Sequence, residues 1–134
     1  MSHWASPYIG RPWQSGGQGP ESYDCWGLVR AIYRSRYGLE LPAVAVDADR
    51  PLAVRHAVAA GAAEKLWRAV TIDELEEGDV VVMSQALQPD HVGLWLDSGG
   101  VLHCARHVGV CFQRPSQLCV HGWNLIAGYR RRLS

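Results

Sequence analysis

The chain has 134 residues, which is enough for one domain with its own hydrophobic core. Thirteen Lys and Arg residues balance thirteen Asp and Glu residues, so no net charge favours a nucleic acid or an anionic membrane as partner. No apolar run approaches the roughly 18 residues of a membrane span, and the N-terminus has neither the basic start nor the apolar stretch of a signal peptide. We therefore expect synthesis in the cytoplasm, with all four cysteines reduced.

Residues 1–22 are expected to form an N-terminal loop region, because "SPYIGRPWQSGGQGPES" is rich in glycine, proline and serine. The following stretch, "YDCWGLVRAIYRSRYG" (23–38), has apolar residues at steps of three and four, which is typical of an amphipathic helix. Ser22 or Asp24 can cap its start, and Gly38 stands where a helix commonly ends. Cys25 therefore lies in the first turn of a helix.

A second helix is predicted from Pro51 to Ala60, which completes a helical half over residues 23–61. The segment "TIDELEEGDV" has a capping-box pattern and predicts a short helical turn. Beyond it the spacing of apolar residues changes from a helical period to that of strands. The predicted strands are 79–83, 91–97, 100–106, 109–113 and 124–131. Helices followed by strands in a small chain indicate an α+β fold, with N-terminal helices packed on an antiparallel sheet of about five strands over residues 78–131. We expect a single domain over residues 1–134.

A cysteine at a helix start has a chemical use. Unpaired N–H groups and the helix dipole place roughly half a positive charge near the sulfur of Cys25, which favours the thiolate and lowers the thiol pKa. An imidazolium nearby would lower that pKa further and form a thiolate–imidazolium nucleophile. The same N–H groups can hold the oxyanion that forms when a carbonyl is attacked. Cys25 is therefore a candidate nucleophile rather than a packing residue.

The six histidines are the candidate bases: His3, His56, His91, His103, His107 and His121. His91 begins one predicted strand and His103 lies in the next, so a hairpin at "DSGG" brings the two strands side by side. A two-residue turn would place the two histidines on opposite faces, whereas a three-residue turn over residues 98–100 would restore a common face. Twist or a bulge must then close the remaining separation along the strands. The resulting triad would be Cys25 as nucleophile, His91 as base and His103 as the orienting group.

These motifs resemble a known family. The combination of "YIGRPWQSGGQGPESYDCWGLV", "LEEGDVVVM" and "HVGLWLDSGGVLHCA" is similar to the NlpC family of papain-like cysteine peptidases, and most of all to its phage-encoded branch of cell-wall peptidases and tail-assembly proteins. The resemblance covers about residues 7–105. It implies a papain-like fold and hydrolysis of peptidoglycan stem peptides at the bond from γ-D-glutamate to a diamino acid. It also implies Cys25 as nucleophile, His91 as base and His103 as third polar residue, with no metal or organic cofactor.

Four further residues are expected around the site: Trp13, Asp24, Trp26 and Trp95. Trp13 stands where many family members have tyrosine and Trp26 where many have serine, so we expect substrate choice, or a loss of activity, to be decided there. Asp24 is expected to cap the helix. Trp95 lies four residues after His91, on the same face of the predicted strand, and is expected to border the site. For the six tryptophans in general, the alternative is that they form core and groove wall rather than sugar-stacking surfaces.

Several alternatives remain open at this point. The chain could be a phage tail-assembly or structural protein with reduced activity or none, or a related thiol amidase or acyltransferase. Phage tail proteins are the expected partners, and a phage tail the expected carrier to the wall. A zinc site within residues 103–121 is disfavoured because six and seven residues separate the successive cysteines and no close pair is present. Cys104 is expected to pack on the opposite sheet face from His103. Cys111 and Cys119 could pair in an oxidising compartment, and "RRR" (130–132) is expected to be a solvated strand end.

Overall fold

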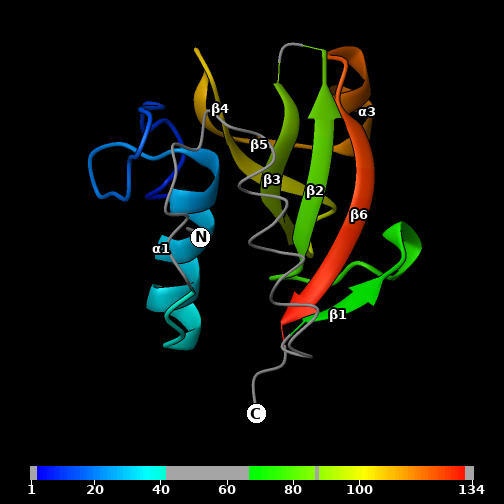
Figure 1. Cartoon of the computed structure of the whole chain (residues 1–134), viewed down its shortest axis with the longest axis horizontal. Coiled ribbons are helices and arrows are strands. Elements are labelled where there is room, and N and C mark those ends of the chain that lie inside the picture. Colours follow the sequence, from blue (N-terminus) through cyan, green and yellow to red (C-terminus); the bar gives the residue numbers. More distant parts are fainter. Residues whose placement is uncertain (1–2, 42–66, 87, 132–134) are drawn as a thin grey trace.

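The computed structural model describes residues 3–41, 67–86 and 88–131 of the chain. Figure 1 shows one long helix beside a strongly curved sheet. The elements are α1 (Cys25–Tyr37), β1 (Trp67–Val70), a 3-10 turn (Ile72–Glu74), β2 (Val80–Gln85), β3 (Gln88–Leu96), β4 (Gly100–Ala105), β5 (Gly109–Gln113), α3 (Pro115–Val120) and β6 (Asn124–Arg131). The helix predicted from Pro51 to Ala60 lies outside the described residues. None of the described helices is long and apolar enough to cross a membrane.

The sheet has six strands in the order β1-β6-β2-β3-β4-β5, and every neighbouring pair is antiparallel. The α+β architecture is therefore as predicted, with one strand more than expected. The additional strand is β1, a four-residue edge strand whose burial does not alternate, so no period-2 pattern marks it in the sequence. The six-residue helix α3 was also not predicted, and it is too short for a helical stripe.

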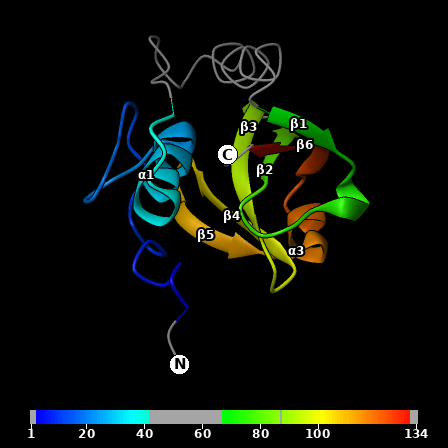
Figure 2. The ribbon, with the colours of Figure 1, turned by 90° about the horizontal axis from the view of Figure 1, so that it is seen from below.

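Helix α1 forms as its sequence predicts. The Asp24 side chain accepts a hydrogen bond from the N–H of Gly27 and caps the helix start. At the other end Gly38 takes a left-handed conformation (φ 63°) and donates its N–H to the last turn, which is a conformation that glycine adopts without steric cost. The buried stripe includes Leu28, Val29 and Ile32, all fully buried. This stripe packs against β3 and β4 on one face of the sheet (Figure 2).

The sheet separates two apolar clusters, and the alternation of side chains along β3 shows the division. Val92, Leu94 and Leu96 point to the cluster that contains α1. Trp95 packs against the second cluster, on the side of α3. The members of that second cluster are Val81, Met83, Val101, Ala105, Leu118 and Trp123. Residues at odd positions of β3, which include His91, therefore face away from the helix that carries Cys25.

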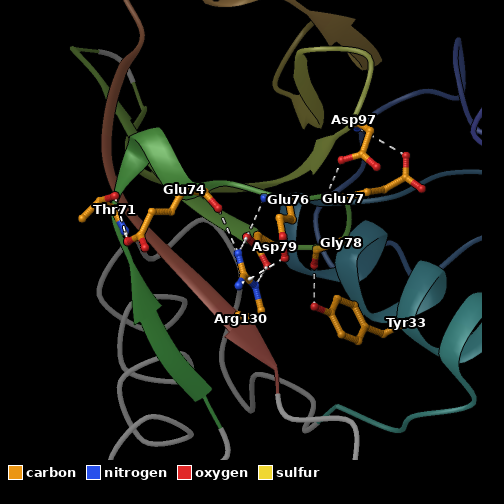
Figure 3. Close-up of polar contacts among 9 residues, drawn as sticks. All are labelled: Tyr33, Thr71, Glu74, Glu76, Glu77, Gly78, Asp79, Asp97 and Arg130. Atoms are coloured by element: carbon orange, nitrogen blue, oxygen red, sulfur yellow. Dashed lines mark hydrogen bonds and ion pairs between the residues drawn. The ribbon is translucent and has the colours of Figure 1, made fainter.

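A polar anchor ties β6 to the start of β2 (Figure 3). Asp79 is 2% exposed, and its two carboxylate oxygens each accept a hydrogen bond of 2.9 Å from the guanidinium of Arg130. The same guanidinium lies 3.2 Å from a carboxylate oxygen of Glu76. Nearby, the hydroxyl of Tyr33 on α1 donates to the carbonyl of Gly78. The expectation of a solvated strand end is therefore wrong for Arg130, because the antiparallel pairing of Val80 with Tyr129 places the next residue of β6 beside a buried acid 51 positions earlier.

Candidate active site

Cys25 is the first residue of α1, and the loop before it is folded tightly against the helix start. The sulfur-bearing side chain is 1% exposed. Gly17 accepts a hydrogen bond from the N–H of Asp24, and an added Cβ on Gly27 would lie 1.9 Å from the carbonyl oxygen of Gly17. The Asp24 carboxylate also accepts from the N–H of Gly16. The glycines around the cysteine thus allow the loop and the helix to approach each other closely.

Three polar side chains from three adjacent strands form a row. Nε2 of His91 on β3 lies 2.9 Å from Nδ1 of His103 on β4, and Nε2 of His103 lies 2.7 Å from Oε1 of Gln113 on β5. Both histidine side chains are fully buried. The register explains the contact: Gly93 pairs with His103, so His91 and His103 are diagonal neighbours on one face, within reach of two imidazole rings.

The hairpin that joins the two histidines has a three-residue loop. Leu96 pairs with Gly100, which leaves residues 97–99 in the turn, with Gly99 at φ 96°. Of the two loop lengths left open by the sequence, the three-residue loop is the one observed, and it places both histidines on a common face; it begins one residue earlier than the loop considered above. No bulge in this hairpin is needed, because the imidazoles span the diagonal distance.

Trp123 supports the histidine pair and was not predicted. Its ring stacks on His91 with centroids 4.6 Å apart and an interplanar angle of 25°, and it meets His103 edge-on at 5.5 Å. The indole therefore restricts the orientation of both imidazole rings. Trp123 lies 32 residues beyond His91 in a turn between α3 and β6, so no local sequence pattern connects it with the histidines.

The thiol of Cys25 lies against the β3 peptide that follows His91. The backbone N–H of Val92, the residue after His91, is a hydrogen-bond partner of the Cys25 sulfur and lowers its pKa. Cys25 packs in the cluster around α1 together with the side chain of Val92, whereas the imidazoles contact Trp123 in the second cluster. The structure thus joins His91 to His103 directly, and it places Cys25 against the backbone that follows His91.

The electrostatics of the thiol differ from expectation. Burial, together with the neighbouring Asp24 carboxylate, raises the pKa of Cys25 to about 12, and the backbone N–H groups of the helix start and of Val92 act in the opposite direction. The expected lowering of the pKa is therefore wrong for this closed arrangement, because removing the sulfur from water outweighs the helix dipole. Burial likewise lowers the pKa of His91 well below its usual value and that of His103 to about 4. At neutral pH the site holds a neutral thiol and two neutral imidazoles.

The other expected site residues have different positions. Asp24 is the helix cap, as predicted. Trp26 is 2% exposed and belongs to the core around α1. Trp13 is half-buried, its indole N–H has no hydrogen-bond partner among the described residues, and the Arg106 guanidinium lies 5.5 Å from its ring centroid. Trp95 is half-buried in the second cluster, on the same side as His91.

The remaining cysteines are free thiols. Cys104 is buried on the α1 side and its thiol donates to the carbonyl of Tyr23, in agreement with its predicted packing role. Cys111 is half-buried, with its sulfur 3.6 Å from Nε2 of His103, and Cys119 is exposed. Within residues 3–41, 67–86 and 88–131, no three His, Cys, Asp or Glu side chains are arranged to hold a metal ion.

Comparison with known proteins gives matches over most of the chain. Residues 10–123 match the model of the NlpC/P60 family. The Escherichia coli (strain K12) protein "Murein DD-endopeptidase MepS/Murein LD-carboxypeptidase" is 24% identical over 95 residues, which are 71% of this chain and 43% of that protein. The chain thus spans less than half the length of the curated relatives it matches.

Solved structures agree on the fold. NlpC2 from Trichomonas vaginalis superposes with a TM-score of 0.65 at 17% identity, covering 95% of this chain and 43% of that one. The NlpC/p60 domain of peptidoglycan hydrolase SagA superposes with a TM-score of 0.61 at 19% identity, covering 90% of this chain and 89% of that one. The fold is therefore the α+β papain-like fold. Because the family model spans all the strands from β1 to β5 and the helix that begins with Cys25, the chain belongs to the NlpC/P60 family.

Proposed function

We propose that the protein is a cysteine peptidase that hydrolyses amide bonds in the stem peptides of peptidoglycan. The observation that carries the proposal is the row His91–His103–Gln113 running beside the peptide that contacts Cys25. A nucleophile at a helix start, a base and an orienting partner are the parts that covalent amide hydrolysis requires. The names of the Escherichia coli relative and of SagA, a murein endopeptidase and a peptidoglycan hydrolase, support the substrate class.

In the proposed reaction the sulfur of Cys25 attacks the scissile carbonyl carbon, and His91, which must come within reach of the sulfur when the site opens, accepts the thiol proton. The oxyanion is held by N–H groups at the start of α1. His91 then donates the proton to the leaving amine as the C–N bond breaks, which leaves a thioester on Cys25. Water, deprotonated by His91, hydrolyses the thioester and restores the thiol. All groups in this cycle belong to the chain itself.

The burial of the site adds a step before chemistry. Cys25 and both histidines are at most 1% exposed, so a substrate reaches the sulfur only after the surrounding loop opens. Opening would also expose the thiol to water. The helix dipole would then no longer be outweighed by burial, and the pKa of Cys25 would fall from about 12. We therefore propose that activation of the nucleophile and admission of substrate are the same event.

The bond between γ-D-glutamate and the diamino acid is the proposed cleavage point. The name of the Escherichia coli relative specifies other bonds, so the substrate set must contain each of them. Purified muropeptides with the γ-D-glutamyl, DD-crosslink and LD-terminal bonds intact are incubated with the protein, and the products are identified by mass spectrometry. Release of a fragment ending in γ-D-glutamate supports the assignment, whereas products of another bond only would move the specificity to that bond.

A second candidate is a tail-assembly protein of a phage or prophage with reduced hydrolase activity or none. The observation that favours it is the same burial, because a closed neutral thiol is inactive as it stands. We further propose that a phage tail carries the protein, as a single domain, to the wall. Mass spectrometry of purified virions from an induced host tests this: the protein co-purifies with tails if the proposal holds, and its absence from virions contradicts it.

A further inference from the structure

Gln113 ends the row of polar side chains and has no part in the reaction as proposed above. It is the last residue of β5, it is half-buried, and its Oε1 lies 2.7 Å from Nε2 of His103. The next link, from Nδ1 of His103 to Nε2 of His91, is 2.9 Å. Both distances are those of hydrogen bonds, so the three side chains are connected across three strands.

The chemistry of the amide oxygen gives this row a direction. A carbonyl oxygen can only accept, so Nε2 of His103 must carry the hydrogen that it donates to Gln113. A neutral imidazole has one protonated nitrogen, so Nδ1 of His103 is bare and accepts from Nε2–H of His91. The lone pair of His91 then lies on its Nδ1. The amide oxygen of Gln113 thus determines, through His103, which ring nitrogen of His91 is basic.

We propose that Gln113 is a positioning residue that fixes His91 in the tautomer with its basic nitrogen at Nδ1. The inference rests on the proposed function for its catalytic meaning, although the tautomer itself can be measured without any activity. The opposite orientation of the amide would reverse the row: His103 would donate from Nδ1 to His91, and the hydrogen of His91 would move to Nδ1. The two directions of hydrogen bonding exclude each other, so a measured tautomer of His91 distinguishes between them.

Other groups around the pair do not supply this direction. The sulfur of Cys111 lies 3.6 Å from Nε2 of His103, but a thiol is a weak partner at that distance beside an amide oxygen at 2.7 Å. The charge of Arg106 lowers the pKa of His91 and so favours the neutral ring without choosing between its nitrogens. Trp123 holds the ring planes by stacking and edge contact only. Of these groups, Gln113 is thus the one that orders the protons of the row.

The experiment is nitrogen NMR of protein labelled with 15N-histidine, in which the shifts of the two ring nitrogens report the tautomer. For the wild type at pH 7.5 the proposal predicts His91 and His103 both protonated at Nε2. Gln113→Leu removes the acceptor and is expected to give mixed or reversed tautomers at both rings. Gln113→Glu keeps an acceptor and adds a charge, so it is expected to retain the tautomer and to move the titration of His103 to higher pH. Gln117→Glu, an equal change of charge on the exposed side of α3, is the control and should leave both rings as in the wild type.

Kinetics with muropeptide complete the test. Gln113→Leu should lower kcat by roughly 10- to 100-fold with little change in KM, as expected when an orienting partner is lost, and Gln113→Glu should restore most of kcat. A wild-type His91 protonated at Nδ1 would overturn the proposal, and so would a Gln113→Leu protein with unchanged tautomers. Failure of the wild type to cleave any muropeptide while the predicted tautomers are observed would instead refute the proposed function and leave the role of Gln113 in place.

Discussion

The burial of His103 predicts a measurable loss of stability in acid. In the folded protein burial lowers the pKa of His103 from 6.5 to about 4, so between these values the unfolded chain binds a proton that the folded chain does not. The contribution of His103 to stability is therefore complete above pH 6.5 and is lost as the pH falls toward 4. Going from pH 7.5 to 4.5 should lower the free energy of unfolding by roughly 2–3 kcal/mol through His103 alone. His91 acts in the same direction, because its pKa is lowered too.

Urea unfolding at a series of pH values measures this effect. Carboxylates that become protonated in acid also change the stability, but they are the same in the wild type and in His103→Gln, so the difference between the two proteins isolates the histidine. The wild type should lose about 2 kcal/mol more than His103→Gln between pH 7.5 and 4.5. His121→Gln, a substitution at an exposed histidine, is the matched control and should follow the wild type. Equal acid losses in the wild type and His103→Gln would refute a buried neutral His103.

Three further predictions concern the thiol, the helix start and the polar anchor. Gly27→Ala should destabilise the protein by about 3 kcal/mol or more in thermal unfolding, because the new Cβ would lie 1.9 Å from a carbonyl oxygen of the preceding loop; an unchanged melting temperature would contradict this packing. Arg130→Met should cost about 3 kcal/mol by leaving Asp79 buried without its cation, and adding Asp79→Asn should recover part of that loss in a double-mutant cycle. Iodoacetamide at pH 8 should alkylate exposed Cys119 well before Cys25, as read by peptide mass spectrometry, and equal rates would contradict a closed site.

Much of the architecture follows from local sequence patterns. The apolar stripe, the capping acid and the terminal glycine of α1 lie within one short segment, and each acts through neighbours a few positions away. The hairpin that aligns His91 with His103 depends on a turn of three residues and on strand alternation. The helix and the hairpin could be predicted because the interactions that determine them are close in sequence, whereas the sequence left the hairpin loop open between two and three residues. Strand β1 and helix α3 could not, since each is too short to show a period and depends on its neighbours in the fold.

The same distinction applies to the candidate site, where local sequence patterns indicate some residues and not others. Residue types and spacing indicate Cys25, His91 and His103 as candidates, but they do not show Gln113 or Trp123, which reach the histidines from β5 and from a turn before β6. Burial is the other property that patterns do not show. A thiol at a helix start has a raised pKa here because the packed surroundings exclude water, and that exclusion depends on the whole fold.

The proposed reaction depends on Cys25 as the nucleophile of a peptidoglycan peptidase. The most direct measurement is muropeptide digestion by the wild type, Cys25→Ala and Cys119→Ala, followed by mass spectrometry of the products. Cys119 is an exposed thiol on α3, so Cys119→Ala controls for loss of a cysteine as such. We expect cleavage by the wild type and by Cys119→Ala, and none by Cys25→Ala. Cleavage that persists in Cys25→Ala would contradict this role of Cys25.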